Sequence, residues 1–181
     1  MTPSFPTEQK IIVDAMTAVF EKSGEGILIT HSAGGGPGLE TAMRSDKVKA
    51  VISLEPDAFP FPEGEVPPAE ETTSLFPAIG ESVSTENSKR LTKIPIVVYF
   101  GDNIPSGDKP AANWGQDKWR TRLNLARKWA QVVNKYGSDV EIVYLPDVGI
   151  KGNMHFTMAD LNNVEVAEVM ESWLKKKGFA K

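Results

Sequence analysis

The amino-acid sequence predicts an α/β protein built on a parallel sheet, because short apolar runs alternate with longer stretches at helical spacing. Four runs are evenly apolar, as in strands buried on both faces: residues 27–31, 48–54, 94–100 and 140–145. A helix between two such strands makes a right-handed βαβ unit. We therefore expect the strands to be ordered as in the sequence, with residues 27–31 at one edge.

The helical stretches follow the same alternation. Residues 7–22 are amphipathic, and Gly24 is placed to end the helix. Further helices are expected at residues 39–44, 118–136 and 162–177. At the start of the last one, Asn162 and Glu165 have the spacing of a capping box.

Residues 56–93 interrupt the alternation, because they are rich in proline, serine and acidic residues. An unstructured insert of that length is uncommon inside a compact domain and is more often a lid or binding loop. A disordered surface excursion remains open as the alternative. Four large apolar residues favour the lid-like insert: Phe59, Phe61, Leu75 and Phe76.

Length and composition narrow the class of protein. A chain of 181 residues, 40% of them hydrophobic, can bury one sizeable core, so residues 1–181 are expected to form a single domain. The net charge of -4, with no basic cluster beyond residues 175–177, argues against nucleic acid or an anionic membrane as the main partner. The absence of cysteine excludes a thiol nucleophile, and two histidines make a structural zinc site improbable.

The sequence also bears on location. No apolar stretch approaches the roughly 20 residues of a membrane span. The first ten residues lack the basic start and apolar core of a signal peptide. We therefore expect a soluble protein, cytoplasmic if Met1 is the native start.

The candidate site begins at residues 26–38, where an apolar run stops at Ser32 and passes into glycines before a helix. This pattern is typical of a nucleophile elbow, in which a sharp strand-to-helix turn lifts a serine hydroxyl to the top of the sheet. The turn needs small residues two before and two after the nucleophile. Gly34 fits this requirement, whereas Thr30 is larger than the usual glycine.

A serine hydroxyl attacks when a general base takes its proton, and a carboxylate orients that base. His155 is the expected base, because its glycine-punctuated loop follows the fourth strand and should lie at the carboxyl ends of the strands, as Ser32 does. His31 precedes the serine and should point to the other side of the sheet. The acid stays open between Glu55, after the second strand, and Asp102, after the third.

Several segments together resemble the carboxyl-terminal half of an α/β-hydrolase esterase family: residues 30–35 (THSAGG), 51–56 (VISLEP), 94–103 (IPIVVYFGDN), 149–156 (GIKGNMHF) and 160–163 (DLNN). The resemblance implies a serine hydrolase that cleaves carboxylic esters through an acyl-enzyme on Ser32. It implies Glu55 as the acid, His155 as the base and the amide of Ala33 as an oxyanion-hole donor. The implied partner is a small-molecule ester, with no cofactor and no metal.

The resemblance leaves out the strands that precede the elbow in a full α/β-hydrolase fold, whose loops normally supply the second oxyanion donor. Residues 27–31 would then form an open edge that is apolar on both faces. We expect a homo-oligomer or a second chain to complete the sheet. The alternative is that the helix over residues 7–22 folds across the edge.

Two other function classes stay open. The first is a non-catalytic hydrolase-like remnant, or a subunit that needs a partner chain. The second is a dinucleotide-binding βαβ unit in which residues 34–38 hold phosphates and Glu55 holds a ribose. Its spacing is poor, because Pro37 falls inside the phosphate turn and Leu39 or Thr41 occupies the place of the third glycine.

Overall fold

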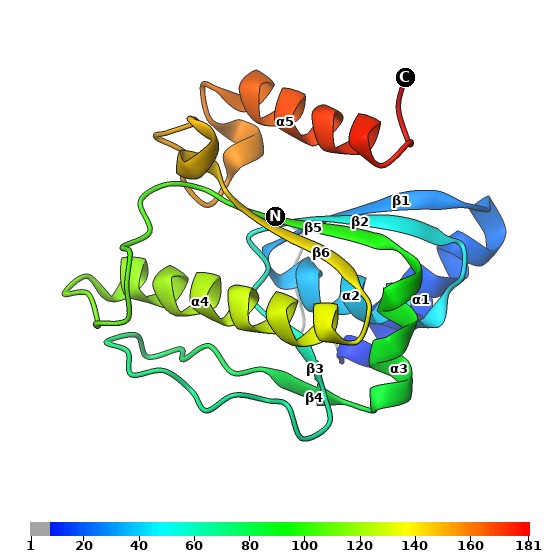
Figure 1. Cartoon of the computed structure of the whole chain (residues 1–181), viewed down its shortest axis with the longest axis horizontal. Coiled ribbons are helices and arrows are strands. Elements are labelled where there is room, and N and C mark those ends of the chain that lie inside the picture. The colour runs from blue at the N-terminus through cyan, green and yellow to red at the C-terminus, as the bar shows by residue number, and fades with distance from the viewer. Residues whose placement is uncertain (1–7) are drawn as a thin grey trace.

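The computed structural model describes residues 8–181 and contains a four-stranded parallel sheet in the order β1-β2-β5-β6 (Figure 1). Its strands are β1 (Gly26–His31), β2 (Val48–Leu54), β5 (Pro95–Phe100) and β6 (Asp139–Tyr144). Every pairing in this sheet is parallel and follows the order of the sequence. The predicted fold class and strand order are therefore confirmed.

Helices cover the sheet unequally (Figure 1). The helices on one side include α1 (Gln9–Ser23), α2 (Gly35–Arg44) and α4 (Trp114–Lys135). On the other side, α5 (Asn163–Lys176) packs through Val166 and Trp173 on the apolar side chains of β2 and β5. Of the expected helix over residues 7–22, Thr7 lies outside the described residues.

Two helices begin earlier than predicted, and one predicted cap is absent. α2 begins at Gly35 instead of residue 39. α4 begins at Trp114, earlier than predicted, because the side chain of Asn113 caps it by accepting hydrogen bonds from the Gly115 and Gln116 amides, at 2.9 and 3.1 Å. The capping box expected at Asn162 is wrong. The Asn162 side chain makes no cap hydrogen bond, because it forms hydrogen bonds with the side chain of Asn153 in the preceding loop instead.

Residues 56–93 contain structure of their own: a parallel pair of β3 (Pro60–Pro62) and β4 (Glu81–Val83), then α3 (Thr85–Lys89). The four large apolar residues on which the lid prediction rests divide into two groups. Phe59 and Phe61 are fully buried in the core beneath α4, where the Phe59 ring lies 5.5 Å from that of Trp129. Leu75 and Phe76 are exposed, so of these four residues only they remain available for the lid role, which stays a prediction.

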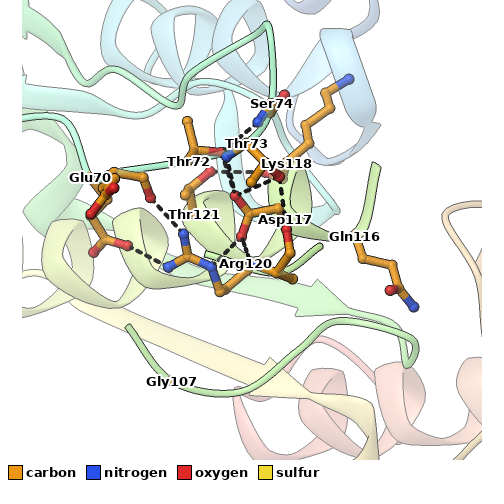
Figure 2. A network of polar contacts seen from close by, with 12 residues as sticks. Glu70, Thr72, Thr73, Ser74, Gly107, Gln116, Asp117, Lys118, Arg120 and Thr121 are labelled. Atoms are coloured by element: carbon orange, nitrogen blue, oxygen red, sulfur yellow. Dashed lines mark hydrogen bonds and ion pairs between the residues drawn. The ribbon is translucent and has the colours of Figure 1, made fainter. Parts of the chain in front are cut away.

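A buried polar network fastens the insert to α4 (Figure 2). Asp117 and Arg120 have no exposed side-chain surface and form an ion pair of 2.6 Å. The second carboxylate oxygen of Asp117 accepts hydrogen bonds from the Thr72 hydroxyl and the Thr73 amide, at 2.6 and 2.7 Å. Arg120 also reaches the carboxylate of Glu70 at 3.3 Å. The insert is therefore tied at residues 70–73.

The outer edge of β1 pairs with no other strand in the part of the chain that the structure describes. Ile29, which lies on this strand, is 57% exposed. α1 packs against α2 and does not fold across the edge, so that alternative is wrong for residues 8–181. Pairing of β1 with a second copy or another chain stays a prediction.

Among residues 8–181, no helix combines the length and apolar character needed to cross a bilayer.

Candidate active site

The structure brings Ser32, His155 and Glu55 together at the carboxyl ends of the strands. Ser32 follows β1, Glu55 follows β2, and His155 lies in the loop before the short helix η4 (Thr157–Ala159). The Nε2 atom of His155 is 2.9 Å from the Ser32 Oγ, and its Nδ1 atom is 2.7 Å from the Glu55 Oε2. With Nδ1–H donating to the carboxylate, Nε2 accepts the serine proton.

Backbone strain is found at the same carboxyl end of the sheet. Among residues 8–181, the non-glycine residues with positive φ are Ser32 at 53°, Glu55 at 42° and Asn103 at 62°. Each lies just beyond the end of β1, β2 or β5. Such conformations cost about 1–3 kcal/mol and persist where the surrounding structure enforces them. Here the turn at Ser32 aims the hydroxyl at His155, as the elbow pattern predicts.

The elbow tolerates Thr30 because α2 presents a glycine to it. A Cβ atom added to Gly38 would lie 2.5 Å from the Thr30 Cγ2. The Thr30 hydroxyl meanwhile donates a buried hydrogen bond of 2.9 Å to the Ser53 Oγ. Thr30 is thus accommodated because Gly38, six residues after Ser32, has no side chain.

We expect Gly38→Ala to destabilise the protein by about 1–3 kcal/mol through overpacking, although alanine is the better helix former by roughly 1 kcal/mol. In a Thr30→Ser background the same change should be neutral or stabilising, since serine keeps the hydroxyl and loses the clashing methyl. Urea denaturation of the four proteins of this cycle measures the coupling. An equal cost of Gly38→Ala in both backgrounds would contradict this account of the elbow.

Close packing also accounts for the glycines that begin α2. A Cβ atom added to Gly35 would lie 2.3 Å from the Pro56 Cβ, and one added to Gly36 would lie 3.1 Å from the Ala58 Cβ. The helix therefore approaches the turn after β2 as closely as its backbone allows. Glu55 also bonds His155. The glycines therefore serve close packing instead of phosphate binding, and Glu55 is not free to bind a ribose as in a dinucleotide site.

Glu55 is 2% exposed and has a partner for each carboxylate oxygen. Its Oε1 accepts a hydrogen bond of 2.7 Å from the Gly101 amide. Burial raises the pKa of Glu55 to about 7, against the lowering effect of that amide. The pKa of His155 is lowered, first by burial and then by the positive charge of Lys118. A lowered pKa keeps the imidazole neutral near pH 7, the form that can accept a proton.

Asp102 does not contact His155 and instead fastens the loop that carries it. Its Oδ2 accepts a hydrogen bond of 3.0 Å from the Gly152 amide, and its own amide donates to the Asn153 carbonyl at 2.9 Å. The bond from Gly152, followed by one from the Asn103 amide, lowers the pKa of Asp102. Of the two acids left open by the sequence, the structure brings Glu55 to the imidazole.

An amide pair braces the same loop from the other side. Asn153 is fully buried, and its side chain exchanges two hydrogen bonds with that of Asn162, at 2.7 and 3.0 Å. Asp160 accepts a bond of 2.9 Å from the Met154 amide. These contacts, together with Asp102, fix the backbone on both sides of His155.

Two ring contacts of His155 are not indicated by the sequence. The Trp119 ring lies 4.3 Å from the imidazole and the His31 ring 4.5 Å from it. His31 faces the α5 side, as expected, but the loop carrying His155 passes over the end of β1, so His31 Nε2 lies 2.8 Å from the His155 carbonyl oxygen. His31 belongs to the elbow motif and Trp119 to the expected helix, but neither motif nor helical spacing indicates that these rings lie against His155.

Two hollows flank the triad. A cavity of about 300 Å³ opens beside the imidazole, with these residues among its lining: Glu55, Asn103, Gln116, Trp119, Met154 and His155. On the serine side, a hollow of about 400 Å³ includes Ala33, Asp57 and Ile79. Both volumes fall within the lower range of small-molecule sites, which begins at about 300 Å³.

No protein-family model matches this sequence. The chain is 26% identical over 203 aligned residues to the probable secreted lipase phiG of Fungal sp. (strain ATCC 74256), over 94% of this chain and 51% of the lipase. It thus spans about half the length of that relative. The lipase is named as secreted, and nothing in the structure supports the expected cytoplasmic location.

Two solved structures are similar. A novel bacterial esterase superposes with a TM-score of 0.68 at 26% identity, over 91% of this chain and 42% of that one. The esterase domain of a Rhodothermus marinus protein superposes with a TM-score of 0.50 at 15% identity, over 91% and 66% respectively, and shows likeness of fold alone. The parallel sheet and these neighbours are consistent with an α/β-hydrolase fold.

Proposed function

We propose that this chain carries the nucleophile, base and acid of a serine hydrolase that cleaves carboxylic esters. The observation that carries the proposal is the unbroken chain of hydrogen bonds from Ser32 through His155 to Glu55. The likeness to a lipase and to esterases supports the class of reaction. The spacing of the three side chains supports their roles.

In this mechanism the Ser32 Oγ attacks the acyl carbon while His155 Nε2 takes the hydroxyl proton. The same nitrogen then gives the proton to the departing alcohol, which leaves an acyl-enzyme. Water attacks the acyl carbon while His155 accepts its proton, and His155 then gives this proton to the Ser32 Oγ as the acyl–oxygen bond breaks, which releases the carboxylic acid and free Ser32. Glu55 holds the imidazole by its Nδ1–H and stabilises the positive charge that His155 carries in both steps.

The amide of Ala33 is the proposed donor to the oxyanion. Ala33 is exposed in the first turn of the helical segment that begins at Ser32, where amide groups have no acceptor within the helix. Two donors are usual, and loss of one typically costs roughly 10²- to 10³-fold in kcat. We propose that a second copy or a further chain covers the open edge of β1, beside which the second donor would lie.

A fluorophosphonate probe tests the nucleophile directly, because it labels serines activated by a base. We expect labelling at Ser32, and we expect Ser32→Ala or His155→Ala to abolish it. Ser172→Ala is the matched control, since this serine lies on α5 and bonds only the Glu168 carbonyl. Labelling that survives in Ser32→Ala would overturn the assignment, and an unlabelled wild-type protein would favour a non-catalytic remnant.

A further inference from the structure

Two cations of α4 lie near the triad, and they share one aromatic neighbour, Trp119, with His155. The Lys118 Nζ is 5.3 Å and the Arg122 Cζ is 5.6 Å from the centre of the Trp119 ring. That ring in turn lies 4.3 Å from the imidazole of His155. Positive charge therefore lies close enough to the site for both cations to lower the pKa of His155, after the larger effect of burial.

Neither cation forms an ion pair with any residue in the range 8–181. Arg122 is only 7% exposed, and its Nε is buried without a hydrogen-bond acceptor. Its Nη1 donates to the Phe76 and Lys118 carbonyls, at 3.2 and 3.1 Å. A buried guanidinium without a carboxylate partner is costly. Arg120 on the same helix shows the usual arrangement, because Asp117 and Glu70 pair with it.

The donors that remain are available to a ligand. Arg122 Nη2 and Lys118 Nζ make no hydrogen bond within the described residues, and neither is among the buried atoms without a partner. Phe76, whose ring centre is 5.9 Å from the Lys118 Nζ, is 59% exposed and offers an apolar surface beside them. The cluster thus combines free cationic donors with an apolar wall.

One acid opposes this charge. Asp57, in the turn after β2, acts to raise the pKa of both cations and of His155. It forms no ion pair with either cation, and burial lowers the pKa of both Lys118 and Arg122 despite it. Two cations facing one carboxylate leave about one uncompensated positive charge, which a monoanion would balance.

We propose that Lys118 and Arg122 form a subsite for a carboxylate on the substrate, so that the preferred ester is a monoester of a short dicarboxylic acid. The carboxylate would receive hydrogen bonds from Lys118 Nζ and Arg122 Nη2, while the aliphatic spacer contacts Phe76 and Trp119. Asp57 limits the strength of the subsite. This inference rests on the proposed esterase function and specifies its substrate class.

The test compares two p-nitrophenyl esters of similar reach, the hemiglutarate and the hexanoate. We expect kcat/KM to favour the hemiglutarate by about tenfold or more, as is usual for a charge-assisted hydrogen bond. Lys118→Met should lower this ratio by about tenfold and Asp57→Asn should raise it. These opposite signs distinguish charge recognition from a general structural loss. Lys135→Met, an exposed lysine at the other end of α4, is the control and should leave the ratio unchanged.

A binding measurement separates this inference from the proposed function. Monomethyl glutarate is titrated into Ser32→Ala protein, and the amide resonances of residues 118–122 are followed by NMR. We expect saturable shifts that are absent with methyl hexanoate and lost in Lys118→Met. Equal hydrolysis of both p-nitrophenyl esters, unaltered by Lys118→Met, would overturn the subsite and leave the esterase standing. If neither ester is hydrolysed, the esterase proposal fails, and the presence or absence of these shifts decides whether the cluster binds a carboxylate.

Discussion

Replacement of Glu55 by glutamine should lower kcat by about four orders of magnitude while the protein stays folded. The amide cannot serve as the carboxylate that accepts Nδ1–H and stabilises the charged imidazole, so His155 is held in the wrong tautomer. The fold should survive, because the amide oxygen can still accept the bond from Gly101. Burial already disfavours the charged form of Glu55, so the neutral glutamine should not destabilise the protein.

The measurement is kcat on a p-nitrophenyl ester, with the thermal midpoint recorded for each variant. Asp102→Asn is the matched control, since Asp102 lies at the same edge of the sheet and bonds only backbone amides. We expect it to cost much less than Glu55→Gln. A larger loss at Asp102 would reverse the assignment of the acid.

The second large effect concerns stability. Asp117→Ala should lower the free energy of unfolding by about 3–5 kcal/mol, because it leaves the buried charge of Arg120 with Glu70 alone. Thr72 and Thr73 lose their shared acceptor at the same time. A domain of this kind has about 5–15 kcal/mol in total, so the loss would be a large fraction.

Chemical denaturation measures this loss, with the exposed Asp108→Ala as control. A second variant, Asp117→Ala with Arg120→Met, should recover part of the stability, since it removes the unpaired charge as well. Burial acts to raise the pKa of Asp117, but hydrogen bonds from Arg120 and Thr72 outweigh it and hold that pKa well below its usual range. A carboxyl whose pKa is lowered on folding stabilises the fold at any pH above its pKa in the unfolded chain. The difference in the free energy of unfolding between Asp117→Ala and wild type should therefore be constant at neutral pH and shrink below about pH 4. A loss below about 1 kcal/mol at pH 7 would contradict the importance of the network.

The sequence predicts those features that depend on local pattern. Val and Ile runs are evenly apolar at residues 48–54 and 94–100 because the strands are buried on both faces, and the structure confirms them. The elbow at Ser32 is visible for a similar reason, since its glycines are adjacent in the chain. The choice between Glu55 and Asp102 is different, because each of them follows a strand at the carboxyl end of the sheet. It depends on strand neighbours, and β2 lies next to β1 whereas β5 lies one strand further away.

Features that join distant parts of the chain leave no such pattern. The ion pair between Arg120 and Glu70 joins residues that are 50 positions apart in the sequence, and no spacing rule connects them. Phe59 is in the core and Phe76 is exposed, although both lie in a segment of similar composition. Their difference follows from β3 passing beneath α4, where the Pro60 carbonyl accepts a hydrogen bond of 2.7 Å from Trp129.

The positive φ angles at Ser32 and Glu55 bear on how this protein could be engineered. Glycine adopts such angles without steric strain, so substitution there would relieve about 1–3 kcal/mol of backbone strain at each position, set against the buried bonds that Glu55 would lose, and would remove the side chain that the proposed chemistry needs. Selection for heat resistance alone would therefore enrich variants that have lost the Ser32 side chain, whose Oγ bonds His155 alone among residues 8–181. A library for stabilisation should hold both positions constant and draw its gains from surfaces remote from them.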